Sequence, residues 1–332
     1  TFICPFGIIG PASIEVWISS PVRSKKPVLI KATRACAALI QAYAVYSGHF
    51  ILFCIGSGLL GAGHAIAQFY RYAAADIVVP EDKPKAVSLA LVGGLVAAIF
   101  GPEISYRLIG AVDGALYAGC FIGAALVQCL ALPVLLGMPK LAVEIREKQG
   151  RPISAFLRLP AFRLALCSAA LGYAVMSFLM TAVPLQIVNV SLLGEALNAR
   201  VIQWHVIAMF APSFFTGSLI TRFGIRAIMT AGLVLYLAGI IVALSGLQFW
   251  YYFATLFFVG LGWNFLYIAG TSLVTLVTEP EERGRVQGIT DMTVFTAVAC
   301  ASLSAGIIHT IGGWHIMALA ALLPISIIGM TI

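Results

Sequence analysis

The chain has 332 residues, of which 61% are hydrophobic and only 10% carry a charge. About a quarter of the residues of a soluble domain are charged, and a soluble domain of this length could not bury so much apolar surface. The composition therefore excludes a soluble globular protein and predicts a chain embedded in a lipid bilayer. The formal net charge of +7 is compatible with a nucleic-acid partner, but the basic residues lie in the turns between apolar segments, so we expect no nucleic acid to bind.

A membrane-spanning helix needs about 20 mostly apolar residues. Eleven segments meet this need: 2–20, 28–47, 50–74, 85–105, 110–137, 161–187, 199–221, 227–246, 249–275, 286–308 and 312–332. The longest polar stretch, 138–160, separates the first five from the last six. The pattern predicts an N-terminal bundle over 1–137, a linker over 138–160 and a six-helix bundle over 161–332.

A charged turn occurs twice, with a shift of 200 residues. When Pro80 is placed on Pro280, four further positions of like charge coincide: Glu81 on Glu281, Asp82 on Glu282, Lys83 on Arg283 and Lys85 on Arg285. This repeat indicates a duplicated bundle. Because the same shift moves 161–187 to a place before residue 1, we expect that the first half lacks its first helix and that the parent architecture is six plus six.

The basic residues indicate how the chain is oriented. Eighteen of the twenty Lys and Arg lie in the linker, at its edge, or in the turns 21–34, 71–85, 222–226 and 283–285; Arg107 and Arg200 fall on the other side. Cytoplasmic loops carry the excess of Lys and Arg. We therefore predict that the linker and these turns are cytoplasmic.

Residues 217–226, GSLITRFGIR, resemble the loop signature G-x-L-x-D-R-x-G-R of the major facilitator superfamily, with Thr221 in place of the acid. The corresponding loop near 11–26 keeps basic charge but has neither the glycines nor the acid. Gly101-Pro102 resemble the Gly-Pro signature in the fifth helix of proton-coupled antiporters. The resemblance implies an all-α membrane protein of two pseudo-symmetric six-helix halves in the bacterial inner membrane, which work by alternating access.

Two further stretches, 203–217 and 262–271, look like a bacterial branch of that superfamily whose members are mostly unassigned and which includes transporters of vitamins such as riboflavin.

Polar side chains in lipid are costly, so each one in an apolar segment is a functional candidate. His64, Gln68 and Arg71 share one helical face and are expected to line a cavity, although Arg71 could instead pair with Asp76 as a gate. In the second half the candidate substrate-binding residues are Tyr173, Met176, Trp263, Asn264 and Tyr267. Aromatic residues with polar tips would suit a planar, partly polar organic solute. Ordinary helix packing is the alternative, because Met most often fills gaps in a core.

Other residues are candidates for ion coupling or gating. His205 suits a proton relay because its usual pKa lies near neutrality; a neutral ring bonded to a neighbouring group is the alternative. We expect Asp291 to form a charge relay with Arg222 or Arg226. The clusters around Asp76 and around Arg283 and Arg285 are expected to latch the two halves together on the cytoplasmic side.

No GxxxxGK[ST] loop for ATP and no HExxH or GxSxG motif is present, which disfavours an ATPase and an enzyme. The seven cysteines lie singly in apolar runs, so we expect no metal and no cofactor. The sequence therefore predicts a secondary active transporter of a small organic solute, driven by an ion gradient, with protons as a candidate ion, or by the solute gradient. The alternatives are a riboflavin-like vitamin transporter of the same fold, a non-transporting membrane scaffold or sensor, and a decayed copy.

Overall fold

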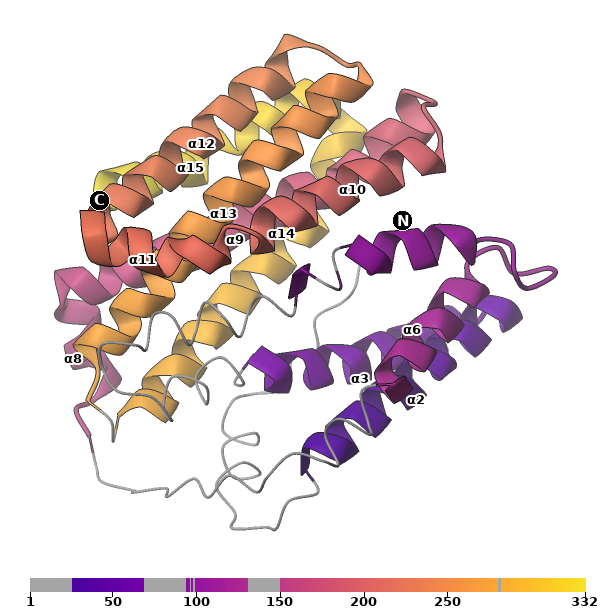
Figure 1. Cartoon of the computed structure of the whole chain (residues 1–332), viewed down its shortest axis with the longest axis horizontal. Helices are drawn as coiled ribbons and strands as arrows, with labels where there is room; N and C mark the ends of the chain where they lie inside the picture. Colours follow the sequence, from indigo (N-terminus) through magenta and orange to yellow (C-terminus); the bar gives the residue numbers. More distant parts are fainter. Residues whose placement is uncertain (1–25, 69–93, 96, 98, 131–149, 280–281) are drawn as a thin grey trace. The chain divides into compact units, whose positions relative to one another are not determined.

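The computed structural model describes residues 26–68, 94–95, 97, 99–130, 150–279 and 282–332 (Figure 1). Every regular element within these ranges is a helix. The chain divides into two compact units. We call the unit that holds Phe2–Tyr70 and Glu103–Arg146 the N-unit, and the unit that holds Arg71–Pro102 and Glu147–Ile332 the C-unit.

The N-unit contains helices α2 (Lys26–Ser47), α3 (Phe50–Gln68) and α6 (Ala118–Leu130). α2 packs on both α3 and α6. Small residues allow helices to approach closely in lipid, and the buried positions of α2 are mostly alanine. Gln41 of α2 donates a hydrogen bond of 2.8 Å to the hydroxyl of Ser57 on α3. An interhelical side-chain bond of this kind fixes the rotation of one helix against the other.

The C-unit contains the predicted segment 161–332. Its elements are α8 (Ile153–Arg158), α9 (Pro160–Pro184), the π-helix η2 (Leu185–Val190), α10 (Glu195–Phe210), α11 (Ser213–Phe223), α12 (Ile225–Ser245), α13 (Phe249–Val277), α14 (Arg283–Ala320) and α15 (Leu322–Thr331). α14 is interrupted at Gly313, whose φ of 67° is accessible to glycine at little cost. This break lies at the second residue of the predicted segment 312–332.

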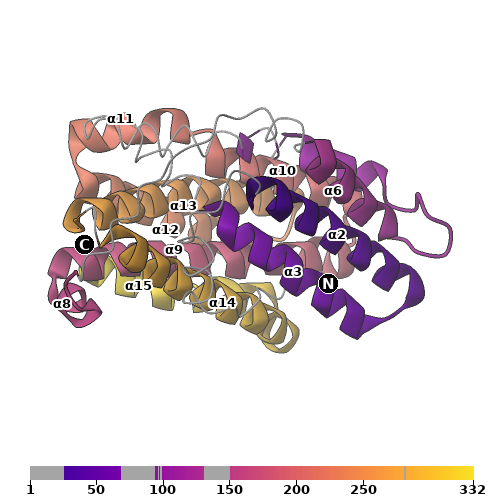
Figure 2. The ribbon, with the colours of Figure 1, turned by 90° about the horizontal axis from the view of Figure 1, so that it is seen from below.

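α13 is the central helix of the C-unit. It packs against α9, α10, α11 and α12, and Figure 2 shows α9, α12 and α13 running side by side. Its glycines permit this close contact: a Cβ on Gly262 would lie 2.8 Å from the carbonyl oxygen of Gly232, and one on Gly270 would lie 2.9 Å from that of Ala165. A side chain at either position would push α13 away from its neighbours.

Within the described residues, four helical segments are long and apolar enough to cross a membrane, or five if one bent pair counts as a single span. That pair is α10 and α11, which the sequence predicts as one span over 199–221. The two helices meet at an angle of 40°. The break lies at Pro212, because proline has no N–H to donate and its ring clashes with the preceding turn.

Several predicted segments fall wholly or partly outside the described residues, namely 2–20, 50–74, 85–105 and 110–137, as does 138–149 of the predicted linker. The boundaries 1–137, 138–160 and 161–332 therefore stay predictions.

Candidate functional site

Five aromatic side chains from four helices form a continuous cluster in the C-unit. Trp263 and Tyr267 lie one turn apart on α13 and stack with their ring centroids 4.9 Å apart. Tyr173 of α9 meets both rings edge-on, at 5.1 and 5.3 Å. Phe210 of α10 lies 5.8 Å from Trp263, and Phe295 of α14 lies 5.9 Å from Tyr173. The structure thus brings together three residues that the sequence singles out, and we call this group the aromatic cluster.

The indole of Trp263 carries an enclosed polar atom. Trp263 and Tyr267 are both 2% exposed, and Met176 is buried on α9 one turn from Tyr173. The Nε1–H of Trp263 has no hydrogen-bond partner among the described residues. A buried donor without an acceptor lowers stability by about 1–3 kcal/mol. An acceptor atom on a bound solute would remove that cost.

Asn264 follows Trp263 in the chain but bonds to a different part of the bundle. Its Nδ2 donates to the carbonyl oxygen of Met209 at 2.6 Å and to the hydroxyl of Ser213 at 2.7 Å. The hydroxyl of Thr216 lies 2.6 Å from its Oδ1. These partners flank the break at Pro212. The amide of Asn264 therefore braces the α10–α11 break.

His205 on α10 is fully buried. Its Nδ1 lies 2.6 Å from the carbonyl oxygen of Leu256, so Nδ1 carries the hydrogen and donates it. Its Nε2 is enclosed and has no partner among the described residues. Protonation of Nε2 would therefore leave a charge unpaired in the interior, which costs several kcal/mol.

A buried polar network, not anticipated from the sequence, lies at the end of α9. His309 Nε2 of α14 lies 2.9 Å from Gln186 Oε1 of η2. The Nε2 of Gln186 donates to the hydroxyl of Tyr252 on α13 at 3.1 Å and to that of Ser191 at 3.3 Å. The two hydroxyls are 2.9 Å apart. The predicted segment 286–308 ends one residue before His309, whereas helix α14 continues beyond it. A longer predicted segment would have made His309 a functional candidate, because ionisable side chains are rare within membrane helices.

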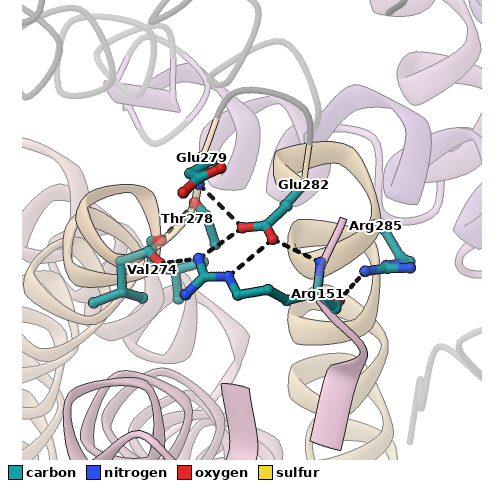
Figure 3. Close-up of polar contacts among 7 residues, drawn as sticks. Arg151, Val274, Thr278, Glu279, Glu282 and Arg285 are labelled. Carbon is teal, nitrogen blue, oxygen red and sulfur yellow. Dashed lines mark hydrogen bonds and ion pairs between the residues drawn. The ribbon is translucent and has the colours of Figure 1, made fainter. Parts of the chain in front are cut away.

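At the opposite end of α13, Arg151 binds Glu282 at the α13–α14 turn (Figure 3). The Arg151 Nε donates to Glu282 Oε1 at 2.9 Å and an Nη to Oε2 at 2.7 Å. The backbone N–H of Arg151 adds a bond of 2.8 Å to Oε1. Hydrogen bonds from the Arg151 side chain lower the pKa of Glu282 to about 2, and the same contact raises the pKa of Arg151. We call this pair the Arg151–Glu282 clamp.

The clamp rests on an apolar core. Phe156 of α8 packs with Phe162, Val274 and Val286. The guanidinium of Arg151 lies 4.6 Å above the ring of Phe156, within the range of a cation–π contact. The end of the predicted linker is thereby fixed to α9, α13 and α14.

The predicted gating residues fall in different settings. Arg285 donates to the carbonyl oxygen of Arg151 (Figure 3), and Arg283 is half-buried. Asp291 is buried on α14, whereas Arg222 and Arg226 are exposed and form no ion pair with it in the described part of the chain. The relay between Asp291 and either arginine therefore stays a prediction.

Four predicted residues lie outside the described part. His64 and Gln68 belong to α3, but their side chains are not described, and neither are Arg71 and Asp76.

Comparison with known proteins defines the class to which this bundle belongs. A family model described as the Major Facilitator Superfamily matches residues 185–332. The riboflavin transporter RfnT of Brucella anthropi is 42% identical over 287 residues, which cover 85% of this chain and 71% of that protein. The uncharacterized MFS-type transporter YdeG of Bacillus subtilis is 31% identical over 80% of this chain and 65% of its own length. The chain belongs to the major facilitator superfamily and is a multi-pass membrane transporter of that type.

Solved structures share the fold. The transporter FucP in the outward conformation matches 99% of this chain and 86% of its own, with a TM-score of 0.65 and 14% identity. A bacterial homologue of the iron transporter ferroportin, in an outward-facing state, matches 97% and 85% with a TM-score of 0.63 and 15% identity. These structures confirm the predicted fold class, and the sequence relatives confirm the predicted superfamily.

Proposed function

We propose that the protein is a secondary active transporter of a planar, partly polar organic solute of the riboflavin kind. The aromatic cluster carries this proposal, and the 42% identity to a riboflavin transporter supports it. The halves 1–137 and 161–332 would expose the solute alternately to the two sides of the bacterial inner membrane, driven by an ion gradient or by the solute gradient.

The chemistry of the cluster suits a flat heteroaromatic ring. Aromatic pairs in edge-on or offset contact contribute about 0.5–1.5 kcal/mol each beyond the area that they bury. A ring that stacked beside Tyr173 or Trp263 would gain such contacts on its face. A carbonyl oxygen or ring nitrogen at its edge could accept the hydrogen bond that Trp263 Nε1 does not make within the described residues.

The gate is proposed on the side of the Arg151–Glu282 clamp. Arg283, Arg285, Arg222, Arg226, Asp291 and Asp76 remain its candidate residues. Glu282 aligns with Asp82 in the repeat, but its carboxylate already accepts three hydrogen bonds from Arg151. We therefore assign Glu282 to the scaffold of the C-unit and not to the contact between the halves.

The test is uptake of labelled riboflavin by the full-length protein in proteoliposomes. We expect saturable uptake, and about threefold to tenfold weaker apparent affinity for Trp263→Phe, which keeps a ring but removes the N–H donor. Trp250→Phe is the matched control, because Trp250 lies on the same helix and is 69% exposed.

Saturable uptake of a sugar or an amino acid instead of riboflavin would overturn the substrate class. A folded, reconstituted protein that moves no member of such a panel would favour the scaffold alternative.

A further inference from the structure

We propose that His309 is a proton-binding site and that its protonation state sets the rate of transport, with Gln186 as the residue that positions its ring. This inference rests on the proposed transport activity, since it assigns the group through which pH would act. It differs from the expectation for His205, and the hydrogen bonds of the two rings decide between them.

The contact with Gln186 fixes which nitrogen of His309 carries hydrogen. The amide of Gln186 uses its Nε2 hydrogens on Tyr252 and Ser191, so its Oε1 faces His309. A carbonyl oxygen can only accept, and therefore Nε2 of His309 must be the donor. The neutral ring then holds its lone pair on Nδ1.

The Nδ1 of His309 can be reached from outside the C-unit. His309 is 9% exposed, its hydrogen bond to Gln186 uses Nε2 alone, and Nδ1 is not among the enclosed polar atoms without a partner in the described part of the chain. A hydronium ion can give its proton to Nδ1 and leave as water, and release follows the reverse path. The bond from Nε2–H to Gln186 persists in both states, so the ring keeps its place while its charge changes.

His205 has a ring N–H bonded to a fixed acceptor but no accessible ring nitrogen. Neither ring nitrogen of His205 can take up a proton from outside, because Nδ1 already donates to Leu256 and Nε2 is enclosed. A proton would have to enter a closed interior and remain there without an acceptor. The comparison assigns proton binding to His309 and a structural bond to His205.

The groups around His309 leave its charge uncancelled. His309 bonds to Gln186 of η2, and Gln186 in turn bonds to Ser191 and to Tyr252 of α13. Glu195 and Arg200 lie on α10, which follows η2, and the exposed His315 lies on α14 itself. The described residues hold no ion pair to His309, so a bound proton adds a full positive charge at this end of the C-unit.

The first test measures riboflavin counterflow in proteoliposomes of the full-length protein, with equal pH on both sides, from about pH 5 to about pH 8. An imidazole changes its charge near neutrality, within this range. We expect the wild-type rate to follow that titration and His309→Gln to abolish the dependence. His315→Gln, the same change at an exposed position of the same helix, should keep the wild-type profile.

The variant Gln186→Leu tests whether Gln186 positions the ring of His309, because a purely structural role of Gln186 would not shift the pH profile. It removes the acceptor for Nε2–H and should shift the midpoint of the profile to lower pH, because the charged ring loses a hydrogen bond. A His309→Gln profile identical to that of the wild type would overturn the proposal, and so would a wild-type rate that does not change with pH.

A second measurement separates failure of this inference from failure of the proposed function. NMR of ¹³C-labelled histidine follows the five imidazoles directly, and single His→Gln variants assign them. We expect His309 to titrate over the same range and His205 to stay unchanged. If the wild type neither binds nor moves riboflavin, the proposed function fails, and the NMR titration alone then supports or overturns the proton site.

Discussion

Trp263 and Asn264 are neighbours in the chain, yet their side chains contact different parts of the bundle. Trp263 stacks on Tyr267, whereas Asn264 bonds to the α10–α11 break. Successive residues of a helix point about 100° apart, so two adjacent polar-tipped residues seldom share one wall. The sequence predicts that both bind substrate, but only the rotation of α13 shows which residues each side chain contacts.

Replacement of Asn264 by Ala tests the brace. The carbonyl of Met209 would lose its donor, and we expect a loss of about 1–2 kcal/mol of stability, seen as a lower unfolding temperature in detergent. Asn189→Ala is the control, because Asn189 is exposed and makes no hydrogen bond among the described residues. A variant with unchanged stability but weaker solute binding would instead support the predicted substrate-binding role.

Residue identity alone anticipated part of the candidate site. Tyr173, Trp263 and Tyr267 are brought together because two of them recur at i and i+4 on α13 and the third lies on the helix packed against it. The pairing of Gln186 with His309 spans 123 positions of the sequence. No local pattern specifies such a contact, since it depends on how two helices rotate against each other.

At the scale of elements, the periodicity of apolar residues predicts that a helix exists but not where it bends or ends. The apolar run over 199–221 predicts one span, and Pro212 within it is the sole local signal for the 40° bend. Likewise the short helix α8 lies inside a stretch that reads as polar linker. Its Phe156 becomes buried only because α13 and α14 supply the rest of a core.

The clamp predicts a dependence of stability on acid. The pKa of Glu282 falls from 4.5 to about 2 on folding, so the folded state favours the ionised carboxylate. Its contribution is fully present above pH 4.5 and is lost as the pH falls towards 2. We expect the unfolding temperature of the wild type to drop in this window more steeply than that of Glu282→Gln.

Glu279→Gln is the control for this titration, because the side chain of Glu279 is exposed. It should keep the acid dependence of the wild type. If the unfolding temperatures of the wild type and of Glu282→Gln fall equally with pH, the carboxylate of Glu282 is not ionised preferentially in the folded state.

At the scale of the whole molecule, composition and segment lengths predicted most of the architecture. The six apolar segments of 161–332 all correspond to helices of the C-unit, because a bilayer demands long apolar helices and leaves few alternatives. Segment 199–221 differs from the structure in its bend at Pro212, and segment 286–308 in the continuation of its helix to the break at Gly313. The choice of solute, in contrast, depends on a few side chains, which is why transporters of one fold carry different solutes.

The clamp also allows a test of how the molecule moves. If the halves rock as rigid bodies, a short bis-thiol link between Arg151→Cys and Glu282→Cys, in a cysteine-free background, joins two points of one body. We expect uptake to continue after linking at the rate of the unlinked variant. Uptake that stops on linking and returns with a cleavable reagent would show that this contact opens during transport.

The same contact sets the length of the connection between the two halves. The predicted linker runs from 138 to 160, but from Gly150 onward the chain is held on the C-unit by Arg151 and Phe156. The tether that remains is 138–149, and twelve residues reach at most about 40 Å when fully extended. Arg151 and the packing of Phe156 together thus limit the length of this connection, and the loss of both would lengthen it.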